Sequence, residues 1–317
     1  MYRCMIELDG TKVLYESNRN LVPDFKQLVR KRIFTEFKVD CKKSDAQFIV
    51  RYFESDYISI QYFKEHVEIY APWSETNNGE TLFYASLPFV EVQHQQSGYQ
   101  TVHAAAVSFP AGAVIILGKE GAGKTTTALK LCRTYGAKLI GNDLVVIGID
   151  KNSGRIMVRG GTKFLHLRYE SMNRNMSDLL HLFKFDSSII DTWLCKLIVD
   201  PKAAGVEVED KIMPLIATYL VHIDNTQDSL FSSKADSVVT RLYLNENFSR
   251  YIRGGSISLL GKDLSYLGFV PSYDSENFFK QRTSFIEKIL KEPEMLYMSG
   301  RLDDVASSIY SRINNGD

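Results

Sequence analysis

The chain has 317 residues, of which 44% are apolar and 24% are charged, proportions that fit a globular protein and exclude a disordered or membrane-embedded one. Its 38 Lys and Arg residues balance its 38 Asp and Glu residues, so no net charge draws it to nucleic acid or to a membrane surface. We therefore expect neither a nucleic-acid partner nor a membrane partner.

The four cysteines, Cys4, Cys41, Cys132 and Cys195, lie far apart and form no C-x-x-C pair. This spacing argues against a structural zinc site and against a disulfide framework, and it favours a reducing compartment. The first residues, MYRCMIELDG, carry no apolar signal core, and the most apolar stretch, 104–117, is too short to cross a bilayer. We expect a cytoplasmic protein.

The first part of the chain predicts an α+β domain over residues 1–95. A hairpin is expected around Asp9-Gly10, a helix over 22–37, and a second helix over 82–95 that Pro88 weakens. Three strands are expected between the helices: FIVRYF, YISIQYF and HVEIYAP. The aromatic residues on these strands predict sheet and core packing rather than a base-stacking platform: Tyr52, Phe53, Tyr57, Tyr62, Phe63 and Tyr70.

The character of the sequence changes near residue 101, where buried-type strands begin to alternate with helices. HAAAVSF and AVIILG predict two strands, 124–135 predicts a helix, and KLIGND with LVVIGID predicts strands that turn at 152–154. RIMVRG, FLHLRY, TWLCKLIVDP and LIATYLVHID read as further strands, with a helix over 169–190. Helices over 274–290 and 303–313 flank a strand at EMLYMSG. The fold class is therefore α/β, in a second domain over 96–317.

Between AVIIL and the helix, the chain matches the pattern G-x-x-x-x-G-K-[ST] at residues 118–125. Glycines let successive backbone N–H groups face one concavity, and the helix that begins there adds its positive dipole end. In such a turn the lysine reaches the β- and γ-phosphates and the Ser or Thr hydroxyl reaches Mg²⁺. The alternative is a simple strand-to-helix turn. We predict an ATP and Mg²⁺ site whose nucleotide-binding residues are Gly118, Gly121, Ala122, Gly123, Lys124, Thr125 and Thr126.

A phosphate-binding turn also needs an acid for the metal and, in a kinase, a base for the acceptor hydroxyl. Asp143 ends KLIGND, the strand that follows the helix, and a strand returning beside AVIIL would bring it to the phosphates. We predict that Thr125 and Asp143 bind the metal; the alternative for Asp143 is a turn residue.

His103 lies on the strand before the glycine-rich turn and is a candidate for the same site, unless it is a buried core residue. Several basic residues farther along the chain are candidates for phosphate or substrate contacts, with solvated surface charges as the alternative. They are Lys163, His166, Arg168, Lys211 and Arg253.

Taken together, HAAAV at 103–107, AVIILGKEGAGKTTTALKL at 113–131 and YGAKLIGNDLVVIG at 135–148 resemble the nucleotide-binding core of the HPr kinase/phosphorylase family. That family shares its fold with phosphoenolpyruvate carboxykinases. The resemblance covers roughly residues 95–170, including RIMVRGGTKFLHLRY, and is looser beyond them; the first 95 residues do not share it. It implies ATP at residues 121–126, Lys124 on the phosphates, and catalytic roles for His103 and Asp143.

The chain departs from this family at Asn142, where HPr kinases have the first residue of an Asp-Asp pair, their usual base and acid. An amide cannot take up a proton at neutral pH. Three alternatives follow: Asp143 serves both roles, a loose transition state needs little base help, or the chain binds nucleotide without transferring phosphate. The family's glycine-rich stretch linked to phosphorolysis and hexamer contacts is absent, so HPr is a doubtful substrate.

Two readings of the function follow, and an oligomer is compatible with both. The first is an ATP- and Mg²⁺-dependent kinase acting on a hydroxyl of a peptide, a protein or a small metabolite, with Lys124, Asp143, His103 and Asn142 at the catalytic centre. Shorter relatives of the family phosphorylate a Ser of precursor peptides, which suits a core joined to a different N-terminal domain. The second is a nucleotide-binding regulatory module with weak or no transfer. A carboxykinase is more distant, because no arginine cluster for oxaloacetate stands out.

Overall fold

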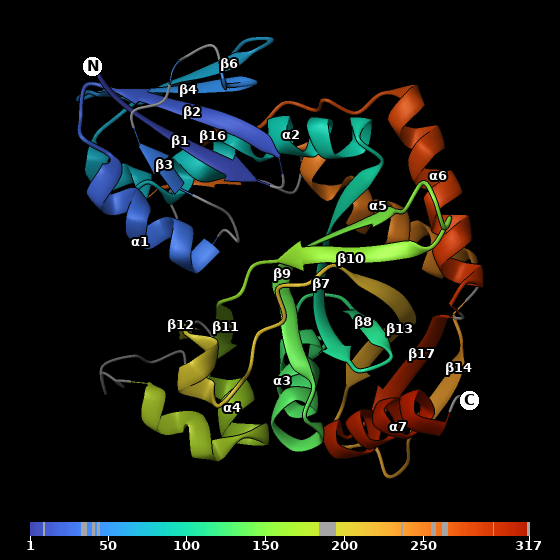
Figure 1. Cartoon of the computed structure of the whole chain (residues 1–317). Helices are drawn as coiled ribbons and strands as arrows, with labels where there is room; N and C mark the ends of the chain where they lie inside the picture. The colour runs from blue at the N-terminus through green and yellow to red at the C-terminus, as the bar shows by residue number, and fades with distance from the viewer. Residues whose placement is uncertain are drawn as a thin grey trace. The chain divides into compact units, whose positions relative to one another are not determined.

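We analysed a computed structural model, which describes residues 1–8, 10–32, 37–39, 42, 45–183, 195–235, 237–254, 258–261, 266–293 and 295–315. The chain forms two compact units (Figure 1), Met1–Thr101 with Glu246–Arg282 and Val102–Asn245 with Thr283–Asp317. The boundary expected between residues 95 and 96 stays a prediction. Residues 246–282 group with the N-terminal residues in the first of these compact units.

The first unit contains a six-stranded sheet in the order β3-β1-β2-β4-β6-β5. The hairpin predicted around Asp9-Gly10 is confirmed as the antiparallel pair β1–β2, and β5–β6 is a second antiparallel pair, whereas β2–β4 and β4–β6 are parallel. The strands are β1 (Tyr2–Leu8), β2 (Thr11–Ser17), β3 (Phe37–Val39), β4 (Phe48–Glu54), β5 (Ser59–Tyr62) and β6 (His66–Ala71).

This unit contains two helices in the regions where helices were expected, α1 (Val22–Arg32) and α2 (Glu80–Gln96). The helix expected over 22–37 is too long: Phe37 begins β3 and pairs with Ile6 of β1. Residues 33–36 lie outside the described residues. The helix expected over 82–95 is confirmed and holds Pro88 in its interior, where burial of an apolar face outweighs the lost hydrogen bond.

The six aromatic residues expected to pack in this sheet and its core differ in exposure: Tyr52 is buried, Tyr57 and Phe63 are exposed, and Phe53, Tyr62 and Tyr70 are half-buried. Core packing is confirmed for Tyr52, which is 0% exposed, and is wrong for Tyr57 and Phe63, which are 59% and 42% exposed. Tyr57 stacks on Tyr70 with 5.6 Å between ring centroids, and Phe63 stacks on His66 at 4.3 Å. These rings pack on one another along the sheet instead of entering the core.

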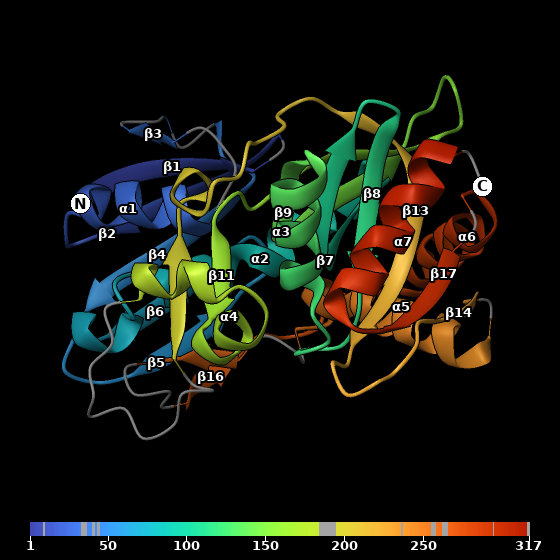
Figure 2. The ribbon, with the colours of Figure 1, turned by 90° about the horizontal axis from the view of Figure 1, so that it is seen from below.

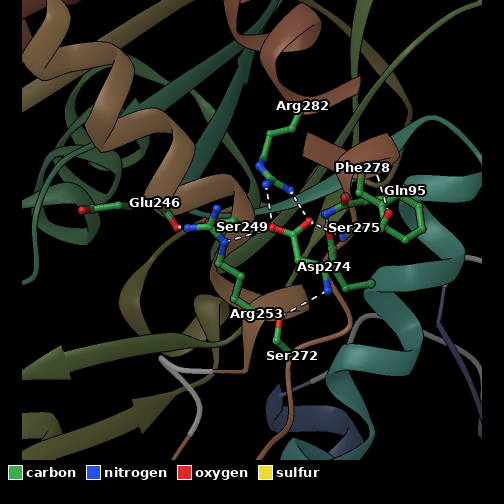
Figure 3. Close-up of polar contacts among 10 residues, drawn as sticks. Gln95, Glu246, Ser249, Arg253, Ser272, Asp274, Ser275, Phe278 and Arg282 are labelled. Carbon is green, nitrogen blue, oxygen red and sulfur yellow. Dashed lines mark hydrogen bonds and ion pairs between the residues drawn. The ribbon is translucent and has the colours of Figure 1, made fainter. Parts of the chain in front are cut away.

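The segment that joins the first unit from late in the chain is held by an ion cluster (Figure 3). Asp274 accepts hydrogen bonds from Nη2 of Arg282 at 2.8 Å and from Nε of Arg253 at 3.0 Å. Arg282 is fully buried. Burial raises the pKa of Asp274, but the two guanidinium groups outweigh it and hold the pKa below its ordinary value. The segment contains β15 (Ser258–Leu260), β16 (Tyr266–Phe269) and parts of α5 (Val238–Arg253) and α6 (Glu276–Lys291).

The second unit is built on a seven-stranded sheet in the order β10-β9-β7-β8-β13-β17-β14. Its central strands β8, β13 and β17 are parallel, and β7 runs antiparallel to β8. The expected strands of this region are confirmed, with KLIGND and LVVIGID joined into one. They are β7 (Tyr99–Phe109), β8 (Gly112–Leu117), β9 (Lys138–Ile149), β10 (Ile156–Gly161), β13 (Met213–Ile223) and β17 (Met295–Gly300). The edge strand β14 (Phe231–Lys234) was not expected.

Helices α3 (Lys124–Tyr135) and α7 (Leu302–Asn315) pack together against this sheet (Figure 2). The rings of Tyr135 and Tyr310 stack between them at 4.6 Å. Every residue of β8 is buried, as its apolar sequence predicts for a strand covered on both faces. The mixed α/β class is thereby confirmed.

The remaining elements are short. The helix expected over 169–190 is α4 (Tyr169–Asn175) followed by a 3₁₀ segment, Ser177–Leu182; residues 184–190 lie outside the described residues. Beside them, β11 (Leu165–Arg168) pairs with β12 (Lys196–Val199). Further 3₁₀ segments are Trp73–Thr76 and Pro201–Ala204. Among the described helices, none has the length and apolar character needed to cross a membrane.

Candidate functional site

The glycine-rich turn connects β8 to α3 and needs glycine for conformational reasons. Gly121 and Gly123 have φ angles of 78° and 95°, in the left-handed region that side chains disfavour. A Cβ at Gly123 would lie 2.4 Å from Cγ1 of Ile223, and one at Gly118 would lie 2.7 Å from the carbonyl oxygen of Val221. The end of β13 therefore packs directly against the turn and leaves no room for larger residues.

The side chain of Lys124 folds back over this turn and is buried. Its Nζ donates hydrogen bonds to the carbonyl oxygens of Gly118 at 2.9 Å and Lys119 at 3.1 Å. The N–H of Gly118 donates to the hydroxyl of Tyr243 on α5 at 2.9 Å, and the N–H of Ile223 donates to the carbonyl of Ala122 at 3.0 Å. The turn is therefore held in a defined shape by its own lysine, by α5 and by β13.

Thr125, in the first turn of α3, is joined to the strand β9. Its hydroxyl donates to Oδ1 of Asn142 at 2.7 Å, while Nδ2 of Asn142 faces the carbonyl oxygen of Phe164 at 3.5 Å. Asn142 is 1% exposed. The neighbour that the structure gives to the Thr125 hydroxyl is thus the residue at which this chain departs from the HPr kinase pattern.

The backbone bends sharply at Asn142-Asp143. Asp143 has φ +75°, and farther along the same strand pair β10 shows a register shift between Val158 and Gly160, opposite Ile147 and Val146 of β9. A Cβ on Gly161 would lie 2.5 Å from the carbonyl oxygen of Leu144 and 2.7 Å from Cα of Gly141. Two glycines thus let β9 and β10 approach closely beside the bend, and the bend aims the Asp143 carboxylate.

Three strands bring together a carboxylate and two imidazoles. The Nε2 atom of His103 on β7 lies 3.0 Å from Oδ1 of Asp143 on β9, and Nδ1 of His166 on β11 lies 3.8 Å from Oδ2. All three side chains are partly buried, with exposures of 18%, 34% and 19% respectively. An imidazole held by a carboxylate can take up a proton from a hydroxyl.

The expected position of the Asp143 strand is wrong in one respect. We expected that strand beside β8, but β7 lies between β8 and β9. Since β7 is adjacent to β9, the arrangement explains why His103 meets Asp143.

The basic residues that the sequence suggested as phosphate or substrate contacts lie in different parts of the structure. Nη2 of Arg168 pairs with Oε1 of Glu120 in the glycine-rich turn at 2.7 Å, so Arg168 belongs to the neighbourhood of the site. Nζ of Lys163 donates to the carbonyls of Ile140 and Glu209 at 2.8 and 2.6 Å, and burial lowers its pKa. Lys163 therefore ties β9 to the segment that follows residue 206.

The two other basic candidates lie elsewhere. Lys211 is exposed, and its backbone N–H donates to Oε1 of Glu209. Arg253 belongs to the first unit and pairs with Asp274. Sequence reasoning missed Tyr243, whose bond to the glycine-rich turn joins residues 125 positions apart. No local sequence pattern predicts a contact over such a separation.

Within the described part of the chain, no group of three or more His, Cys, Asp or Glu side chains could hold a metal ion by itself. The Thr125 hydroxyl and the Asn142 amide oxygen are hard oxygen donors, which suit Mg²⁺ that keeps several waters and phosphate ligands. The turn that excludes a Cβ at Gly118 and Gly123 likewise fits the close approach of phosphate to backbone.

Comparisons with known proteins add little to these contacts. Neither a protein-family model nor a curated protein matches the chain. Among solved structures, the Hpr(Ser) kinase/phosphatase from Coxiella burnetii is similar at 16% identity, over 41% of this chain and 69% of that one, with a TM-score of 0.24. So low a TM-score does not establish a shared fold, and the contacts within the chain carry the proposals below.

Proposed function

We propose that this chain is an ATP- and Mg²⁺-dependent kinase that transfers the γ-phosphate to a hydroxyl of a peptide, a protein or a small metabolite. The observation that carries the proposal is the adjacency of Asn142 and Asp143. One bonds to Thr125 at the start of α3, and the other bonds to His103. A bend of two residues thus joins a phosphate-type turn to a proton-accepting pair.

The phosphate half of the site consists of the glycine-rich turn and its helix. Backbone N–H groups at a helix N-terminus bind anions, and Lys124 adds a full positive charge. Thr125 and Asn142 replace the expected pair Thr125 and Asp143 as metal ligands in this proposal, because the Thr125 hydroxyl contacts Asn142 and Asp143 contacts His103. Both are neutral oxygen ligands, so the phosphates supply the negative charge that binds the cation. Bound Mg²⁺ would neutralise charge on the transferring phosphoryl group.

The acceptor half consists of His103, Asp143 and His166. In the proposed role, Asp143 orients His103 through the 3.0 Å contact, and one of the two accepts the proton of the acceptor hydroxyl. Arg168, paired with Glu120 of the turn, is the arginine proposed for contact with the transferring group.

The second candidate function, a nucleotide-binding module without transfer, is favoured by Asn142 itself. An amide supplies no negative charge to the metal and accepts no proton. In this reading the Thr125–Asn142 bond would position the turn for binding only, and the chain would report the bound state to a partner.

The test is ADP release from γ-labelled ATP with Mg²⁺, measured with and without a panel of Ser- and Thr-containing peptides and hydroxylated metabolites. Acceptor-dependent ADP and label transfer support the kinase. If ATP raises the melting temperature but no acceptor changes the rate, the module is the better description. A chain that neither binds nor hydrolyses ATP refutes both.

A further inference from the structure

The three parallel strands of the second sheet end at one edge. The register pairs β8 with β13 and β13 with β17, and Leu117, Ile223 and Gly300 are the last residues of these strands. The next residues are Gly118 of the glycine-rich turn, Asp224 and Arg301. Ligands of α/β sheets bind outside the carboxyl ends of their strands, so Asp224 and Arg301 stand where a ligand of the turn would extend.

The order of the strands gives the order of contacts. Ile223 at the end of β13 packs directly against Gly123 of the turn, and Gly300 lies beside Ile223 on β17, about 4.8 Å farther from the turn. In a nucleoside triphosphate the ribose follows the phosphates and the base follows the ribose. Asp224 therefore falls at the level of the ribose, and Arg301 falls at the level of the base.

The loop that carries Asp224 is fixed to its surroundings. Its N–H donates to the carbonyl of Gly300 at 2.9 Å, and its Oδ1 accepts from the hydroxyl of Thr226 at 2.7 Å. Asn225 extends the bracing, since its Nδ2 donates to Oδ1 of Asn175 at 2.9 Å. The hydrogen bonds from Thr226 lower the pKa of Asp224, which therefore carries a negative charge at neutral pH. A fixed carboxylate at this position can accept hydrogen bonds from ribose hydroxyls.

Arg301 differs from Asp224 both in its positive charge and in the freedom of its side chain. Its side chain is exposed and makes no hydrogen bond or ion pair with any residue that the structure describes. Most exposed charges need no explanation, but this one follows the last residue of β17, beside the loop that bears Asp224. A planar guanidinium free of other partners can stack on the face of a nucleobase.

We propose that Asp224 and Arg301 bind the nucleoside half of the nucleotide, Asp224 through the ribose hydroxyls and Arg301 by stacking on the base. This inference rests on the proposed nucleotide site at the glycine-rich turn. It assigns the turn to the triphosphate alone and makes the ends of β13 and β17 responsible for the preference for a nucleotide over other polyphosphates.

The experiment compares ligands by isothermal titration calorimetry with Mg²⁺ present. ATP, inorganic tripolyphosphate and 2′,3′-dideoxy-ATP are titrated into the full chain and into Arg301→Ala, Asp224→Ser and, as a control, Arg155→Ala. Arg155 is an exposed arginine on the β9–β10 hairpin. Serine at 224 keeps an oxygen that can cap the Thr226 turn but is too short to reach a ribose.

We expect Arg301→Ala to weaken ATP about tenfold, as loss of one stacking contact does, and to leave tripolyphosphate unchanged. Asp224→Ser should bring ATP and its dideoxy analogue to equal affinity, and Arg155→Ala should match the unmodified chain. Variants that bind ATP like the unmodified chain, while that chain binds tripolyphosphate, would overturn this inference alone. An unmodified chain that binds neither ligand would overturn the proposed function as well.

Discussion

The hydroxyl of Thr125 donates a hydrogen bond of 2.7 Å to the side-chain oxygen of Asn142. This bond joins the first turn of α3 to β9, and Asn142 is almost completely buried. An acid at position 142 would put a charge at this buried place, whereas the amide keeps the same hydrogen bond without one. A substitution at Asn142 therefore tests the proposed metal site directly.

Asn142→Asp should lower the free energy of unfolding in the absence of Mg²⁺ by about 1–3 kcal/mol, because it buries a charge beside a single hydroxyl donor. Mg²⁺ should recover much of the loss, since the new carboxylate would lie next to the cation. Urea unfolding with and without Mg²⁺ measures both effects. Asn142→Ala is the control and should lose stability without any recovery; equal behaviour of the two variants would contradict a metal site here.

Lys124→Ala should reduce acceptor-dependent ADP release about a hundredfold or more, because it removes the positive charge aimed at the phosphates. The fold should persist, since the turn is also held by the bonds from Gly118 to Tyr243 and from Ile223 to Ala122. Circular dichroism and a steady-state ADP assay check the two halves of this prediction. Lys130→Ala, on the same helix, is the matched control; full activity of the Lys124 variant would refute the role of the turn.

Asp143→Asn should remove the charge of this side chain while keeping the backbone conformation. Asparagine tolerates the left-handed conformation that Asp143 adopts at φ +75°, so we expect stability to change by less than about 1 kcal/mol. The rate of transfer should fall about 10²- to 10⁴-fold, because the carboxylate that holds His103 is gone. Single-turnover transfer of labelled phosphate gives the rate; a variant as fast as the unmodified chain would exclude Asp143 from proton transfer.

Acid should weaken the first unit through Asp274. Its pKa lies below the ordinary value in the folded chain, so its contribution is complete above about pH 4 and is lost as the pH falls through the lower folded pKa. Asp274→Asn should cost about 3 kcal/mol at pH 7 because it leaves Arg282 buried without its carboxylate. The free energy of opening of the α6 amides, measured by hydrogen exchange from pH 3 to 7, should differ between the unmodified chain and Asp274→Asn at pH 7 and converge toward low pH. A difference that stays constant with pH would contradict this prediction.

Gly161→Ala should disturb the bend at Asn142-Asp143 without touching either side chain. The new methyl would lie 2.5 Å from the carbonyl of Leu144, so β9 and β10 must separate, at an expected cost of about 2–3 kcal/mol. Gly154→Ala is the control, because nothing lies within 4 Å of its added Cβ and only its φ of +67° is strained. Thermal unfolding of both variants is the measurement; equal losses would show that close strand approach is unimportant.

Local patterns predicted the elements around the glycine-rich turn well. Helix α3 has the expected bounds, Lys124 to Tyr135, because a glycine stands at each end. The hairpins formed where turn residues interrupt alternating strands. The helix expected over 22–37 is longer than α1, because the pairing of Phe37 with β1 is a long-range contact that helical spacing cannot predict.

The candidate site was predictable in its members but not in its pairings. The sequence indicates His103, Asn142 and Asp143, yet the bond from Thr125 to Asn142 depends on the bend at φ +75° and on the glycines beneath it. Helix α5 was not expected at all: it begins with Val238-Val239-Thr240, a β-branched run of poor helical propensity. Its residue Tyr243 nevertheless bonds to Gly118.

The folded-back position of Lys124 changes how an anion would arrive at the turn. Its ammonium group already satisfies two carbonyl oxygens, so an incoming anion must exchange for those bonds rather than add new ones. The heat of binding from this residue should then be small and its contribution mainly one of charge. Association would include a rearrangement step, and its rate would level off at high ligand concentration instead of rising in proportion to it.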